Sequence, residues 1–209
     1  MKQLTVSELE QSSRFVKVIE LDHRELVPFV QYNLRHRTAV VWAYYTANML
    51  LLLAVAMMGA YDYTRHYLSL VDILVHCSYG FLLFFPFLLI LHEWIHGLSY
   101  RWLGAAKVSY VAQWRKLVFF ALADRFVVGR KGFALLAFSP FVIINTLLII
   151  ACLLTGGLWK WTFLAAMVIH TGGCAGDFAL FNYFYRHRKQ EVYTYDDAAE
   201  GKSYFYHAP

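Results

Sequence analysis

The segment Leu88-Leu-Ile-Leu-His92-Glu-Trp-Ile-His96-Gly97 places two histidines and a glutamate inside a long apolar run. On an α-helix, His92 and His96 lie one turn apart on the same face, and two imidazoles at this spacing can bind one Zn²⁺. Glu93 follows the first histidine and can polarise a zinc-bound water without binding the metal itself. The alternative is a packed helix that carries three polar residues by chance. Because ionisable groups in so apolar a segment are costly without partners, the sequence favours a metal site.

The composition is that of a membrane protein. Hydrophobic residues make up 59% of the 209 positions and charged residues only 16%, and this length predicts a single domain. The three cysteines are widely spaced, so we expect small buried side chains rather than a disulfide framework. Cys174 keeps the alternative of lying near the metal. We expect no nucleic-acid partner, because the net charge of +5 comes from bases that flank apolar segments.

Four stretches are long and apolar enough to cross a bilayer. They cover residues 39–61, 73–91, 132–155 and 161–184, and the second runs directly into the HExxH motif. We therefore expect a mainly α membrane protein with four transmembrane helices, which make up a metalloprotease-like domain in residues 39–189. An N-terminal segment of residues 1–38 precedes this domain, and a tail of residues 190–209 follows it.

The connection between the second and third spans is basic and rich in β-forming residues. Residues 101–131 carry seven bases against a single acid, Asp124. Within them, residues 107–113 and 117–122 flank a turn candidate at 113–116, which predicts a β-hairpin at the membrane surface. The alternative is an irregular basic loop held there by lipid headgroups.

The two ends of the chain hold weaker signals. Residues 15–21 predict a short strand. Residues 23–37 are weakly amphipathic and predict either an interfacial helix or part of a solvated tail. Residues 190–209 carry three acids among tyrosines, and they either form a strand or stay disordered.

The distribution of bases predicts the orientation. Arg and Lys residues gather at 35–37, 101–131 and 186–189, whereas the two other loops carry only Arg65 and Lys160. Because cytoplasmic loops carry an excess of bases, we expect both termini and the hairpin on the cytoplasmic side of the cell membrane.

A carboxylate in the fourth stretch supplies a candidate third ligand. His92 and Asp177 precede the boundary residues Arg101 and Arg186, respectively, by nine positions each. If both helices run from outside to inside, both side chains lie about 13 Å from the same boundary. A charge at that depth needs a partner, which a metal provides, so Asp177 is the predicted third zinc ligand. The alternative is a salt bridge, or a hydrogen bond to a helix broken by the preceding glycines.

Two further polar residues lie in the spans. His170 precedes Asp177 by seven residues, about 10 Å along a continuous helix, which is too far to share one metal. We therefore expect it to be structural or to support the ligands. Asn145 reaches a depth similar to that of the metal ligands, where it either donates a hydrogen bond to a substrate carbonyl or links helices.

This order of features resembles the core of the site-2-type intramembrane zinc proteases. The features are HExxH in one span, a basic β-rich segment, Ser139-Pro140 with Asn145 in the next span, and an aspartate in the one after. That larger family has Asn-Pro-x-Asp-Gly at the third ligand, where this chain has Gly176-Asp177-Phe178. It also has Gly-Pro where this chain has Ser-Pro.

The sequence is more similar to the DUF3267 zincin peptidases. The similarity covers most of the chain from about residue 39, and it is carried by His92-Glu-Trp-Ile-His-Gly97 and by Gly176-Asp177 near a short tyrosine-rich tail. The resemblance implies zinc bound by His92, His96 and Asp177, with Glu93 as general base, in a membrane-bound peptidase.

We therefore expect a zinc metallopeptidase that hydrolyses a peptide bond near the cytoplasmic membrane face. Zn²⁺ is the expected cofactor, with Glu93 acting on the attacking water. Peptides or membrane proteins are the expected substrates, and the lipid bilayer is the other partner. The alternative from another class is a non-catalytic membrane adaptor or chaperone on a protease-like scaffold, in which Glu93 has no task. Haem binding or ion transport through the histidines is a third and weaker alternative.

Overall fold

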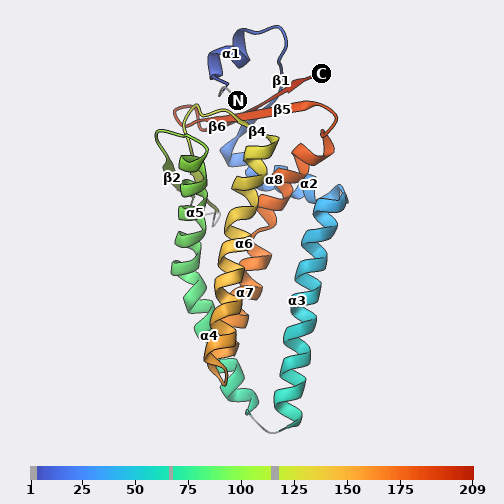
Figure 1. Cartoon of the computed structure of the whole chain (residues 1–209), viewed down its shortest axis with the longest axis vertical. Helices are drawn as coiled ribbons and strands as arrows, with labels where there is room; N and C mark the ends of the chain where they lie inside the picture. The colour runs from blue at the N-terminus through green and yellow to red at the C-terminus, as the bar shows by residue number, and fades with distance from the viewer. Residues whose placement is uncertain (1–3, 66–67, 114–117) are drawn as a thin grey trace. The chain divides into compact units, whose positions relative to one another are not determined.

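The computed structural model describes residues 4–65, 68–113 and 118–209 (Figure 1). The helices are α1 Val6–Gln11, α2 Leu26–Arg35, α3 Ala39–Thr64, α4 Leu70–Leu83, α5 Leu89–Trp102, α6 Arg130–Thr155, α7 Trp159–Gly173 and α8 Ala175–Arg186, with a 3-10 turn η1 at His23–Glu25 and a π-helical turn η2 at Phe84–Leu88. The strands are β1 Val16–Asp22, β2 Ser109–Gln113, β3 Val118–Leu122, β4 Val128–Gly129, β5 Glu191–Asp197 and β6 Lys202–Ala208.

The described chain is mostly helical, and it has three helical stretches that are long and apolar enough to cross a membrane. They are α3, α6 and the α7–α8 run from Trp159 to Arg186. The chain divides into two compact units. Unit 1 holds residues 1–41, 93–139 and 176–209, and unit 2 holds residues 42–92 and 140–175.

The predicted second span, 73–91, is not one continuous helix. It consists of α4, the π-helical turn and the start of α5, and Phe85 within the turn has non-helical backbone angles of φ −103° and ψ 112°. The following residue is Pro86, and a residue before proline is pushed out of the α region and into the β region. α4 is apolar but has only 14 residues. The span predicted at residues 73–91, and with it the total of four transmembrane helices, is therefore not confirmed.

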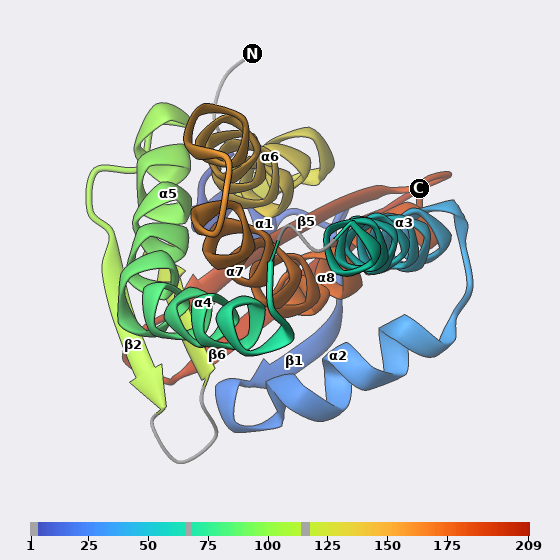
Figure 2. The ribbon, with the colours of Figure 1, turned by 90° about the horizontal axis from the view of Figure 1, so that it is seen from below.

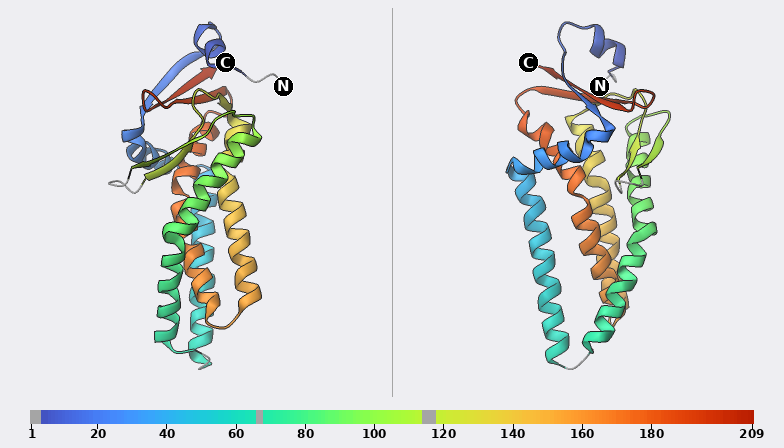
Figure 3. Two further views of the ribbon diagram at one scale, coloured as in Figure 1. Left: turned by 90° about the vertical axis from the view of Figure 1, so that its left-hand side faces the viewer. Right: turned by 180° about the vertical axis from the view of Figure 1, so that it is seen from behind.

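Unit 1 contains a four-stranded antiparallel sheet in the order β1-β6-β5-β4 (Figures 1 and 3). β1 confirms the strand predicted at residues 15–21, and α2 confirms a helix within residues 23–37. The C-terminal tail forms β5 and β6, which are joined by a turn in which Gly201 has φ +66°, a conformation that favours glycine. The two ends of the chain therefore pair with each other, which the sequence did not predict.

Both faces of this sheet are covered. Successive strand residues face opposite sides, so Tyr206 packs with Leu9 of α1 while the adjacent Phe205 packs with Phe184 of α8. Leu9, Phe184 and Phe205 are almost fully buried. The aromatic residues of the tail thus form much of the hydrophobic core of unit 1.

A carboxylate of β5 links the sheet to the helix that carries the HExxH motif. Asp196 accepts a hydrogen bond from the hydroxyl of Tyr100 on α5 and another from Ser203 Oγ at 2.5 Å, and His23 Nε2 lies 3.9 Å away. Loss of solvent raises the pKa of the Asp196 carboxyl, against the lowering effects of these partners. The sheet therefore fixes the C-terminal end of α5.

The predicted β-hairpin is present in unit 1. β2 and β3 pair antiparallel from Ser109 opposite Leu122 to Gln113 opposite Val118. The turn between these strands is expected at residues 113–116. Residues 114–116 lie outside the described residues.

In unit 2, α4 and α7 lie side by side (Figures 1 and 2). A Cβ atom at Gly80 of α4 would overlap the carbonyl oxygen of Thr162 and the side chain of Ala165 on α7. The Thr162 hydroxyl donates a hydrogen bond to the carbonyl of His76 at 3.0 Å. Small residues at helix contacts allow this close approach, which stabilises apolar helices through dispersion and interhelical hydrogen bonds.

Substitution Gly80→Ala is expected to destabilise the protein by about 1–3 kcal/mol, because the added methyl forces α4 away from α7. Thermal unfolding in detergent measures the effect. Gly172→Ala is the matched control, since a Cβ there would meet its nearest neighbour, Asn48 Oδ1, at an ordinary 3.8 Å. Equal melting temperatures for the two variants would contradict the packing assigned to Gly80.

Candidate metal centre

The HExxH motif lies on α5, where His92 and His96 are one helical turn apart on the same face. Within unit 1, His96 Nε2 lies 3.2 Å from Asp177 Oδ1, and these side chains are 13% and 15% exposed. Two of the three predicted ligands are therefore in direct contact, and the third precedes His96 by one turn of the same helix.

The chain geometry explains how Asp177 reaches this position. The fourth predicted span is divided at Cys174 into α7 and α8, and Asp177 lies in the first turn of α8. A carboxylate in the first turn of a helix is favoured by the positive end of the helix dipole. The break also means that depths inferred from one continuous helix do not apply across residue 174.

The contact between His96 and Asp177 fits a shared zinc ion. Zinc–nitrogen and zinc–oxygen bonds are about 2.0–2.2 Å long, and in a tetrahedral site this places neighbouring donor atoms about 3.4 Å apart. The observed 3.2 Å between His96 Nε2 and Asp177 Oδ1 is close to that separation. The pair also makes a short ion contact without metal, so the donor chemistry and the HExxH spacing carry the argument for zinc.

Glu93 is held by the hairpin. Its Oε2 accepts a hydrogen bond of 2.8 Å from the backbone N–H of Ala121 on β3. A backbone donor fixes the carboxylate without neutralising it, so Glu93 stays available to take up a proton.

The hairpin approaches α5 closely at the residue that follows the motif. A Cβ atom at Gly97 would overlap the hydroxyl of Tyr110 on β2, and Tyr110 is the strand partner of Ala121. Glycine at position 97 is therefore needed for the hairpin to reach Glu93.

A second contact links α5 to α6. The Ser99 hydroxyl on α5 and the Ser139 hydroxyl on α6 lie 2.7 Å apart.

The two remaining predicted site residues, His170 and Asn145, lie close to each other in unit 2, and His170 also contacts His92. His92 Nδ1 lies 3.2 Å from His170 Nε2, and His170 Nδ1 lies 3.4 Å from Asn145 Oδ1. Asn145 Oδ1 also accepts a hydrogen bond from the Thr171 hydroxyl at 3.1 Å. His170 thus lies next to the first histidine of the motif.

Cys174 belongs to the same cluster. The sequence predicted mainly a small buried side chain at this position, with a place near the metal as the alternative. Its Sγ lies 3.8 Å from His170 Nε2, and one donor atom from each of His92, His170 and Cys174 falls within 4.8 Å of the others. The signal was present, because His170 and Cys174 are four residues apart and so share a helical face, as the two histidines of HExxH do.

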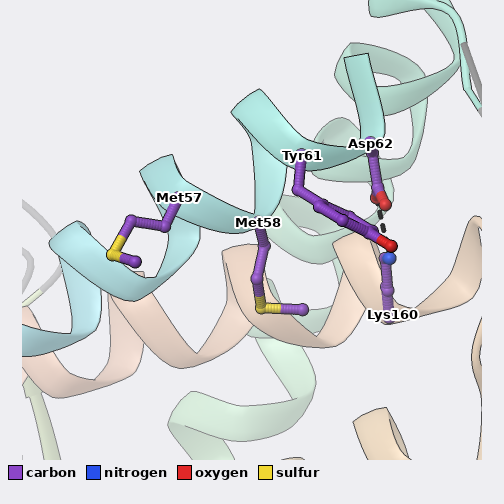
Figure 4. Close-up of a pocket in the computed structure, with 5 residues that line it drawn as sticks. All are labelled: Met57, Met58, Tyr61, Asp62 and Lys160. Carbon is purple, nitrogen blue, oxygen red and sulfur yellow. Dashed lines mark ion pairs between the residues drawn. The ribbon is translucent and has the colours of Figure 1, made fainter. Parts of the chain in front are cut away.

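A pocket in unit 2 lies away from these residues. It is lined by Met57, Met58, Tyr61, Asp62 and Lys160 (Figure 4). Lys160 Nζ pairs with Asp62 Oδ2 at 2.7 Å, and Trp161 Nε1 donates to the same oxygen. Lys160 lies at the start of α7 and His170 near its end, about 15 Å along the helix. The charges in the pocket are satisfied by each other, which is typical of an ion pair between packed helices.

Two histidines and a glutamate in HExxH, with a nearby aspartate, are typical of zinc-dependent peptidases. Residues 85–192, which include all of these residues, match the family described as "putative zincin peptidase" (DUF3267). Because the match covers more than half of the chain, the protein belongs to this family. Comparisons with curated proteins and with solved structures found no match.

Substitution Gly97→Ala is expected to destabilise the protein by about 1–3 kcal/mol, because the methyl group displaces Tyr110 and with it the hairpin. The double variant Gly97→Ala/Tyr110→Ala is expected to recover much of this loss relative to Tyr110→Ala alone, and thermal unfolding of the four proteins measures the coupling. Additive effects of the two substitutions would contradict the contact.

Proposed function

We propose that this protein is a zinc-dependent peptidase embedded in the cell membrane, with His92, His96 and Asp177 as zinc ligands and Glu93 as general base. The observation that carries the proposal is the contact of Asp177 with His96 of the HExxH motif on α5, because this contact joins the donor types of a zinc site to the spacing of one. Membership of the zincin peptidase family supports the reaction class, and the apolar helices support the membrane location.

The residues fit the ion that the family name implies. Two imidazoles and one carboxylate are a common protein donor set of catalytic zinc sites, which keep one position open for water or substrate. When bound, zinc lowers the pKa of a water molecule toward neutrality and polarises the substrate carbonyl.

The chain's own residues supply the proton transfers. Glu93 accepts the proton of the attacking water and later passes it to the leaving amine. The hydrogen bond from the Ala121 N–H keeps the Glu93 carboxylate in one orientation, so the base does not have to be ordered during the reaction. The hairpin therefore acts as the support of the general base.

His170 and Asn145 are proposed to position His92. If His170 carries its proton on Nδ1, it donates to Asn145 Oδ1 and accepts from the Nδ1–H of His92. This arrangement leaves the Nε2 lone pair of His92 for the metal, and such supporting contacts are common around metal-binding histidines. The Oδ1 of Asn145 accepts these hydrogen bonds, and its amide N–H groups are proposed donors to a substrate carbonyl.

We propose four membrane-crossing segments, which are α3, the broken run of α4 and the start of α5, α6, and the α7–α8 run. Both termini and the hairpin are proposed to lie on the cytoplasmic side. The proposal rests on the bases at residues 35–37, 101–131 and 186–189 and on the few bases in the other loops. Substrates in this setting are peptides or membrane proteins, and a helical substrate has to unwind locally because a helix hides its backbone.

A non-catalytic adaptor or chaperone on the same scaffold is the competing function. Such a protein gains nothing from a carboxylate next to the first histidine, whereas a peptidase needs it. The hydrogen bond that orients Glu93 favours the peptidase.

Zinc content and peptide hydrolysis by purified protein in detergent test the proposal. We expect one zinc per wild-type chain. The ligands are tested in a Cys174→Ser background, which removes a thiol close to His92, and there His96→Ala and Asp177→Ala are expected to lose the zinc. Glu93→Gln is expected to keep the zinc and to lower hydrolysis by about 10²–10⁴-fold, because only the base is removed.

Glu25→Gln is the matched control, since Glu25 is an exposed carboxylate at the turn before α2. It should retain both zinc and activity. Unchanged hydrolysis in Glu93→Gln would refute the catalytic role, and a metal-free wild type that is folded would refute the zinc site.

A further inference from the structure

The cluster of His92, His170 and Cys174 has the geometry of a metal site in its own right. Its donor atoms lie within 4.8 Å of one another, with 3.2 Å between the two ring nitrogens and 3.8 Å between His170 Nε2 and Cys174 Sγ. In a tetrahedral zinc site, neighbouring nitrogen donors are about 3.4 Å apart, and a nitrogen and a sulfur about 3.6 Å apart. A small movement of the three side chains would therefore bring them around one ion.

The surroundings suit a thiophilic ion. His170 is 1% exposed, and the Cys174 side chain is fully buried. A thiolate with two imidazoles is a soft donor set, which favours ions such as Zn²⁺, Cd²⁺ and Cu⁺ over Mg²⁺ or Ca²⁺. Asn145 Oδ1 lies 3.4 Å from His170 Nδ1, and a hydrogen bond there turns the Nε2 lone pair of His170 toward the other two donors.

We propose that His92, His170 and Cys174 form a second binding site for a thiophilic metal ion, and that this site competes with the catalytic one for His92. A neutral imidazole has a single lone pair. The nitrogen of His92 that faces His170 is Nδ1, so an ion bound in the cluster takes His92 in the form that carries its proton on Nε2. His92 in this form cannot bind the catalytic zinc.

Binding of a metal ion to this cluster moves protons but involves no redox step. Binding displaces the thiol proton of Cys174 to solvent, and the proton of His92 moves from Nδ1 to Nε2, while His170 keeps its proton on Nδ1. In the zinc-loaded protein, Nε2 of His92 first has to leave the zinc, which then keeps only His96 and Asp177 as ligands from the chain. Excess thiophilic metal therefore inhibits the peptidase through Cys174. The inhibition rests on the proposed function, but the metal binding does not.

Hydrogen bonding alone is the competing explanation of the cluster. A separation of 3.8 Å between Cys174 Sγ and His170 Nε2 also fits a weak S–H donor on an imidazole. In that case the thiol stays protonated when metal is added, and no metal–sulfur bond forms.

Cobalt titration of the full chain carrying His96→Ala and Asp177→Ala separates the two explanations. These substitutions remove two proposed catalytic ligands and leave the cluster intact. We expect one equivalent of Co²⁺ to bind with a thiolate-to-cobalt charge-transfer absorption in the near ultraviolet. The absorption should disappear on adding Cys174→Ser and persist with Cys77→Ser or Cys152→Ser. A folded protein without this absorption, or an absorption that survives Cys174→Ser, would overturn the proposal.

Cadmium inhibition of the wild type provides a second test that does not depend on the folding of the double variant. With one equivalent of zinc bound, excess Cd²⁺ should lower hydrolysis at least tenfold, and Cys174→Ser should remove most of this inhibition. Equal inhibition of both proteins would refute the competition for His92. Absence of hydrolysis before cadmium is added would instead count against the peptidase, and the cobalt spectrum would still decide whether the second site exists.

Discussion

The contact between His96 and Asp177 is the interaction on which the site depends. His96 lies in the middle of α5 and Asp177 in the first turn of α8. In a mostly apolar chain, an ionisable side chain without a partner costs several kcal/mol. At 3.2 Å they satisfy each other, and they do so with the donor atoms and the spacing that a zinc ion needs. A bound zinc ion would offset the remaining cost of desolvation, which gives a physical reason for this donor set in an apolar setting.

The rest of unit 1 supports this contact from several directions. Asp196 holds Tyr100 at one end of α5, the Ser99–Ser139 contact holds α5 against α6, and Ala121 holds Glu93. Catalytic groups have to be fixed to within fractions of an ångström to be effective. The sheet formed by β1, β6, β5 and β4 therefore helps to hold α5 in place, through the contact of Asp196 with Tyr100.

Local patterns were readable from the sequence, and non-local ones were not. The four-residue spacing of His92 and His96 and the β-rich runs of the hairpin predicted the helix and the strand pairing, because helix faces and strand alternation depend only on neighbouring residues. The pairing of β1 with β6 joins residues that are nearly the whole chain apart, and no local pattern encodes it. Hydropathy alone does not place the breaks at Phe85 and Cys174, although the glycines before Asp177 left a broken helix as an alternative. The four-residue spacing of His170 and Cys174 indicates a shared helical face, but the depth estimate assumed one continuous helix.

X-ray absorption at the zinc edge, on full-length protein loaded with one equivalent of zinc, tests the central claim most directly. Ligation by His92, His96 and Asp177 predicts only nitrogen and oxygen donors, at about 2.0–2.2 Å, with the scattering pattern of two imidazoles. A sulfur donor at about 2.3 Å, or the pattern of a single imidazole, would contradict the account.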